Sequence, residues 1–144
     1  MPHNQVALLV AHPSLTFLRH PHESEKRADL LFSMTETLME WRRQDRPILH
    51  FLTGDLEQSK PEQGLEPNRH EYVFKTVARV IETAPKREEK RIKMLRVIGA
   101  LPSKDLAHLS EHLMCAGIQV RTSAYGFRID DSSALTLRQD NHGD

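Results

Sequence analysis

The run Val6-Ala7-Leu8-Leu9-Val10 constrains the fold more than any other segment of the chain. Consecutive apolar residues bounded by polar ones are typical of a short strand that is buried on both faces. Strands of this kind belong to parallel sheets that are covered by helices on both sides. A chain of 144 residues is long enough to bury such a sheet in one domain. The run therefore predicts an α/β protein.

The segments that follow alternate between helix and strand. Residues 24–43 are predicted to form an amphipathic helix with Ser24 as its N-cap. Its apolar side chains recur at intervals of three and four: Leu31, Met34, Leu38 and Trp41. A second helix is predicted from Ser103 to the C-cap residue Gly117. Apolar runs predict further strands at residues 48–52, 94–99 and 118–122, with a short edge strand at 127–129.

Two parts of the chain are harder to assign. Residues 55–69 are rich in proline, glycine and acidic side chains, so we expect a surface loop. Residues 70–83 have helical spacing at Val73, Val77 and Val80, but a short strand at Tyr72–Phe74 before the helix is equally consistent. We expect one α/β domain over residues 1–131, followed by a polar C-terminal tail at 132–144.

The order strand, helix, strand occurs twice. It favours an open, mostly parallel sheet of about four to five strands with helices on both faces, a three-layer Rossmann-like arrangement. One alternative concerns the C-terminal half alone. The helix at 103–117 and the two short strands around Ala124-Tyr125-Gly126 are also consistent with a winged-helix module, which would bind DNA. The N-terminal strand–helix–strand unit argues against that reading for the whole chain.

Composition narrows the classes of function. Lysine plus arginine (20) equals aspartate plus glutamate (20), so no global field attracts nucleic acid or an anionic membrane, and self-association into a homo-oligomer is plausible. The single cysteine excludes an internal disulfide. We see no signal peptide, no apolar run long enough for a membrane span and no glycine-rich phosphate loop. We therefore expect a cytoplasmic protein without a bound cofactor.

Candidate catalytic residues lie where the predicted strands end, because ligands of open α/β sheets usually bind beyond the carboxyl ends of the strands. His12 is the candidate general base and Ser14 the candidate nucleophile, and Lys75 and Asp105 join them at the same edge. The simpler explanation is that these are ordinary turn and capping residues, which every strand–helix connection carries.

The segment His108-Leu109-Ser110-Glu111-His112 has the H-x-x-E-H arrangement of some zinc proteases. Zinc would need a third protein ligand, and the apolar face of this helix is committed to the core. We therefore expect two solvent-exposed histidines and no metal site. Cys115 follows Met114 at the end of the helix, and we expect it to be a small core residue rather than a nucleophile.

Four segments, in chain order, resemble the isochorismatase-like cysteine hydrolases. They are Ala7–Val10 with Phe17-Leu18, Trp41–Arg43 with Arg46–His50, Val73–Lys75, and Leu95–Gly99 with Ala116–Val120. The resemblance implies a three-layer α/β fold. It also implies three catalytic positions: an aspartate after the first strand, a lysine midway along the chain, and a cysteine at the start of a later helix.

Only Lys75 matches this catalytic set. The aspartate position falls at Ala11 or His12, and the cysteine position falls at Lys104 or Asp105. The chain's one cysteine lies at the other end of that helix. Without a thiolate and its base the family's covalent hydrolysis cannot proceed.

The sequence therefore predicts a non-catalytic α/β domain that acts through protein–protein contacts, as a homo-oligomer or a subunit of a larger assembly. A small hydrolase that uses residues at the strand ends is the first alternative. A DNA-binding winged-helix module in the C-terminal half is the second.

Overall fold

A single parallel sheet organises the protein. The computed structural model describes residues 5–13, 24–52, 61–62, 64–83 and 92–130. The strands of these ranges are β1 (Val6–Ala11), β2 (Ile48–Phe51), β3 (Tyr72–Phe74), β4 (Met94–Leu101) and β5 (Gln119–Ile129). They form one sheet in the order β3-β2-β1-β4-β5, and each neighbouring pair is parallel. The predicted parallel α/β fold is confirmed.

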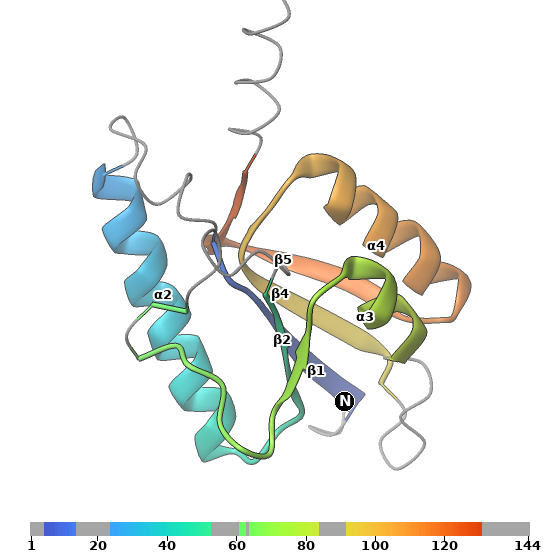
Figure 1. Cartoon of the computed structure of the whole chain (residues 1–144), viewed down its shortest axis with the longest axis horizontal. Coiled ribbons are helices and arrows are strands. Elements are labelled where there is room, and N and C mark those ends of the chain that lie inside the picture. The colour runs from blue at the N-terminus through green and yellow to red at the C-terminus, as the bar shows by residue number, and fades with distance from the viewer. Residues whose placement is uncertain (1–4, 14–23, 53–60, 63, 84–91, 131–144) are drawn as a thin grey trace, which may run out of the picture.

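Helices cover both faces of this sheet. The helix α2 (Ser24–Arg43) lies against one face, and α3 (Val77–Thr83) and α4 (Ser103–Cys115) lie against the other (Figure 1). Along β1, Leu8 and Val10 pack in the cluster with α2, whereas Leu9 packs in the cluster with α3 and α4. Residues Ala7–Ala11 are at most 1% exposed, so β1 is buried on both faces as its apolar run predicts.

The long helix packs through a single stripe of side chains. The buried members are spaced four, four and three apart: Leu30, Met34, Leu38 and Trp41. Burying a side chain of this size contributes roughly 1.5–3 kcal/mol. Removing one of them, as in Met34→Ala, would cost about 2–5 kcal/mol. The helix is therefore held by tertiary packing on the α2 side of the sheet.

The C-terminal strand differs from its prediction. The two short strands expected at 118–122 and 127–129 are one strand, β5, which runs parallel to β4. Its register shifts between Val97, which pairs with Thr122, and Gly99, which pairs with Phe127. The intervening residues of β5 form a bulge. The apolar pattern is interrupted there, so the sequence predicted two strands in place of one. An antiparallel wing is absent from these described residues, so they do not form a winged-helix module.

The structure also resolves the assignment of residues 70–83 and of part of the predicted loop at 55–69. Tyr72–Phe74 is a strand and α3 follows it, so residues 70–83 begin with a strand. Part of the predicted surface loop belongs to the core, because Leu65 is 1% exposed and packs with the α2 cluster. Residues 53–60 and 63 of that loop, and the predicted tail at 132–144, lie outside the described residues. Within the described ranges no helix is long and apolar enough to cross a membrane.

Candidate functional site

Three of the four predicted catalytic residues are described by the structure, and they lie at the carboxyl edge of the sheet. His12 directly follows β1, Lys75 directly follows β3, and Asp105 lies in the first turn of α4, after β4. His12 is buried, Asp105 is half-buried and Lys75 is exposed. Within the described part of the chain, no hydrogen bond or ion pair joins any two of these residues. Ser14 lies outside the described residues, so the catalytic assignment stays a prediction.

A series of buried and half-buried polar side chains, joined by hydrogen bonds, begins at His12. Its Nε2 lies 2.8 Å from Nδ1 of His50, and the two rings stack with their centroids 5.1 Å apart. The pairing register explains the contact. Val10 pairs with His50, and the backbone N–H of His12 donates to the carbonyl of Phe51, so both imidazoles project from the α2 face of the sheet.

The hydrogen-bonded series continues from His50 to Glu71 and then to Arg42. Nε2 of His50 lies 2.7 Å from Oε1 of Glu71, which precedes β3. The Arg42 guanidinium, in the last turn of α2, donates two 2.8 Å bonds to the two carboxylate oxygens of Glu71. The backbone N–H of Asn68 donates a further bond to Oε1 of Glu71. Four side chains from four segments are thereby joined in series.

The charge state of Glu71 sets the direction of these bonds. Burial alone would raise the pKa of Glu71, but the bonds from Arg42, Asn68 and His50 lower it to about 2. An ionised carboxylate only accepts, so Nε2–H of His50 donates to it. Burial lowers the pKa of His50, so its ring is neutral and its Nδ1 carries a lone pair. Nε2–H of His12 therefore donates to His50.

These bonds leave Nδ1 of His12 as a lone-pair acceptor. This atom is buried and has no hydrogen-bond partner among the described residues. Burial, and secondarily the neighbouring His50, lowers the pKa of His12 to about 3. An imidazole with such a pKa is a weak proton acceptor near pH 7. His12 is therefore better suited to accept a hydrogen bond than to act as a general base.

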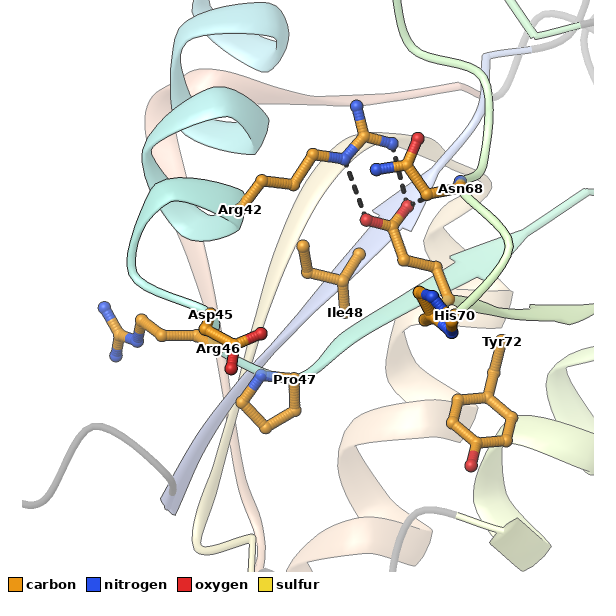
Figure 2. Close-up of a pocket in the computed structure, with 9 residues that line it drawn as sticks. Arg42, Asp45, Arg46, Pro47, Ile48, Asn68, His70 and Tyr72 are labelled. Carbon is orange, nitrogen blue, oxygen red and sulfur yellow. Dashed lines mark hydrogen bonds and ion pairs between the residues drawn. The ribbon is translucent and has the colours of Figure 1, made fainter.

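A pocket of about 320 Å³ lies at the other end of the polar chain. It lies at the start of β2 and β3 and is lined by Arg42, Asp45, Arg46, Pro47, Ile48, Asn68, His70, Glu71 and Tyr72. Arg42 and Asn68 lie at one end, Pro47 and Tyr72 at the other, and Ile48 between them (Figure 2). The lining combines both signs of charge with apolar contact surface, which suits a small polar ligand or a peptide side chain.

The H-x-x-E-H segment has the structure expected of an exposed helix face. His108 and His112 are exposed on α4, with their rings edge to face and their centroids 4.3 Å apart. Among the described residues no group of three or more histidine, cysteine or acidic side chains could hold a metal ion. The prediction for Cys115 is wrong, because this residue is exposed. The buried stripe of α4 runs through Leu109 and Leu113, and Cys115 lies on the opposite side of the helix.

Sequence reasoning missed His50, Glu71 and Arg42 as partners of His12. The contact between the two histidines spans 38 positions, and periodicity carries no information on such pairs. One signal was present, since His50 is a polar residue within an otherwise apolar strand. A buried polar group needs a hydrogen-bond partner, so this residue pointed to a polar contact inside the core.

Comparison with known proteins identifies the fold. No family model and no curated protein sequence matches the chain. Solved structures do match. An isochorismatase family protein from Desulfovibrio vulgaris has a TM-score of 0.69 at 13% identity, covering 97% of this chain and 90% of that one. An isochorismatase from Pseudomonas putida has a TM-score of 0.68 at 16% identity, covering 87% and 71%.

A structure named MAR1 ribonuclease from Caenorhabditis elegans also matches, with a TM-score of 0.63 at 12% identity over 99% of this chain and 75% of that one. The matching proteins differ in their named activities, and at such identities the likeness is one of architecture. It agrees with the resemblance seen in the sequence and with the strand order described above. The chain therefore has the isochorismatase-like fold.

Proposed function

We propose that this protein is a binding and assembly domain on an isochorismatase-like scaffold, which acts through protein–protein contacts rather than by hydrolysis. The observation that carries the proposal is the state of His12. It lies directly after β1, and it is one of the two residues, with Ala11, near which the resemblance puts the family's aspartate; its Nε2 lies 2.8 Å from Nδ1 of His50. A buried neutral imidazole does not supply the negative charge of a carboxylate.

The nucleophile position supports the same proposal. The first turn of α4 carries Ser103, Lys104 and Asp105 and no thiol. Cys115 is the last residue of α4, so the length of the helix separates its thiol from the carboxyl edge of the sheet. The family's covalent hydrolysis requires a thiolate and a base at one place.

The two edge strands supply contact surface for a partner. Large apolar side chains on β3 and β5 are between 45% and 79% exposed: Tyr72, Val73, Tyr125 and Ile129. In the described part of the chain, each of these strands pairs on one side only. An unprotected edge with apolar side chains is a template for pairing with another chain. Near-zero net charge removes the repulsion between copies.

The proposal is tested by measuring the mass of the protein in solution and by searching for a protein partner. We expect light scattering after gel filtration to give a mass above that of one chain, or pull-down to recover a defined protein partner. We expect Ile129→Lys to weaken that assembly, because a charged side chain blocks an exposed edge. Lys104→Gln, on an exposed part of α4, is the matched control. A monodisperse monomer that recruits no partner would count against the proposal.

A hydrolase that uses the carboxyl edge is the second candidate. The observation in its favour is Nδ1 of His12, which has no hydrogen-bond partner among the described residues and lies at the edge that also carries Lys75. It predicts a turnover of esters, amides or phosphates that His12→Gln and Lys75→Met both abolish. Equal, background rates for the natural protein and both variants would exclude it and leave the binding domain.

A further inference from the structure

The single tryptophan of the chain lies beside two arginines. Trp41, near the end of α2, is 5% exposed. The guanidinium carbon of Arg46 lies 3.8 Å from the centroid of its ring, and that of Arg96, on β4, lies 5.7 Å from it. Cation–π attraction to the indole partly offsets the cost of placing two like charges together.

The described part of the chain gives these cations no acidic partner. Within the described residues neither Arg46 nor Arg96 forms an ion pair with a carboxylate. Arg46 donates one bond from Nη1 to the amide oxygen of Gln44, at 3.2 Å. Burial, and secondarily Arg96, lowers the pKa of Arg46, as expected for a cation that faces another cation.

Two buried N–H donors belong to the same group of side chains. Nε–H of Arg46 and Nε1–H of Trp41 are both buried, and neither has a hydrogen-bond partner among the described residues. Buried N–H groups are nearly always paired in folded proteins, and each exception calls for an explanation such as a bound water or ion. Two unpaired donors together with two guanidinium charges form an arrangement that favours an anion.

A hollow of about 480 Å³ lies beside this cluster. It is lined by Glu36, Thr37, Met39, Glu40, Trp41, Arg43 and Arg96, whereas Arg46 lines the pocket of about 320 Å³ described above. Glu40 and Arg43 neutralise each other through a 3.0 Å ion pair. The remaining charged side chains of the lining are Glu36, which is exposed, and Arg96, which lies beside the indole. An anionic group in the hollow would therefore meet Arg96 beside Trp41, and Arg46 adds a second positive charge over the same indole from outside the hollow.

We propose that Arg46 and Arg96 form an oxyanion site beside Trp41, which takes the phosphate or carboxylate group of a small ligand. Guanidinium groups present planar donors that match the acceptor oxygens of both groups. Arg46 lies between α2 and β2, so the site lies away from the carboxyl edge that carries His12. The proposal goes beyond the proposed function and does not depend on it.

Trp41 provides the readout, because the chain contains no other tryptophan. Its fluorescence is followed while the full protein is titrated with inorganic phosphate, with acetate, and with chloride at matched ionic strength. We expect a saturable change with phosphate that chloride does not produce. A response to acetate as well would assign the site to oxyanions in general, and a response to phosphate alone would assign it to phosphate groups.

Variants test the two arginines separately. Arg96→Gln and Arg46→Gln should each weaken phosphate binding at least about tenfold, the effect expected when a charge-assisted bond is lost. Arg79→Gln, whose side chain is 70% exposed on α3 at the other face of the sheet, should leave it unchanged. Circular dichroism checks that each variant is folded.

The thermal unfolding midpoint is measured in the same buffers, because a bound anion stabilises the folded state even where the fluorescence is silent. A higher midpoint with phosphate that Arg96→Gln removes would support the site. The same response in Arg96→Gln as in Arg79→Gln, or no specific phosphate effect on either the fluorescence or the midpoint, would overturn it.

Discussion

Nε2 of His12 lies 2.8 Å from Nδ1 of His50, and His50 in turn contacts Glu71 at 2.7 Å. The two histidines are in contact because their strands pair in a register that projects both side chains from one face of the sheet. The ionised carboxylate of Glu71 accepts a hydrogen bond from His50. This fixes which ring nitrogen of His50, and in turn of His12, carries the proton. Hydrogen bonds therefore connect the Arg42–Glu71 pair to His12 at the carboxyl edge of the sheet.

The first prediction concerns the tautomers of the two rings. Because ionised Glu71 only accepts, His50 and His12 should both carry their proton on Nε2 at neutral pH. Long-range ¹H–¹⁵N spectra distinguish the two ring nitrogens and measure this directly. A proton on Nδ1 of either neutral ring would refute the proposed direction of the chain. His70, which is exposed, is the internal control and should not be fixed in a single tautomer.

The second prediction concerns pH. The folded pKa of His12 is about 3 against 6.5, so below pH 6.5 the unfolded chain binds a proton that the folded chain does not. Stability should therefore be complete above pH 6.5 and fall as the pH drops from there toward 3. Glu71, with a folded pKa of about 2 against 4.5, adds a loss below pH 4.5. Each group contributes up to roughly 1.4 kcal/mol per pH unit within its window.

Urea unfolding at a series of pH values measures this slope. His12→Gln removes one titrating group, so its stability should fall less steeply between pH 6.5 and 4.5 than that of the natural protein. Met114→Gln, at an exposed site on α4, removes no titrating group and should leave the slope unchanged. Identical slopes in all three proteins would contradict the burial of a neutral His12.

The third prediction separates two adjacent arginines. Arg42→Met removes both bonds to Glu71, whose side chain is 8% exposed, and leaves that carboxylate without its charged partner. We expect a loss of about 2–3 kcal/mol in the free energy of unfolding. Arg43→Met removes only a surface ion pair with Glu40 and should cost less than about 0.5 kcal/mol. Equal losses of unfolding free energy for the two variants in urea would show that the Arg42–Glu71 pair contributes no more to stability than the surface pair.

Features of this protein that depend on local sequence spacing were predictable, and features that depend on contacts between distant segments were not. The strand β1 and the helix α2 were predictable because their apolar spacing is local and reports burial directly. The series from His12 to Arg42 was not, since it depends on strand register and on contacts between distant segments. Leu65 was missed for the same reason: one apolar residue in a polar loop has no period, yet it packs against α2.

The last prediction tests the close approach of Gly99 on β4 to Ala11 on β1. Gly99 has φ +105°, and a Cβ placed on it would lie 1.8 Å from the carbonyl oxygen of Ala11 and 2.7 Å from its carbon. These are backbone atoms of a buried strand, so no side chain can move aside to make room. Gly99→Ala should therefore cost more than about 3 kcal/mol, or prevent folding altogether.

Gly117 is the matched control. It has φ +82°, but a Cβ there would meet nothing within 4 Å. Gly117→Ala should carry only the conformational cost of a left-handed alanine, about 1–2 kcal/mol. Equal losses for the two variants would mean that backbone conformation, rather than the contact with Ala11, makes glycine necessary. Ala11 directly precedes His12, so a Gly99→Ala protein that still folds should also show altered ring nitrogen shifts for His12, whereas Gly117→Ala should not.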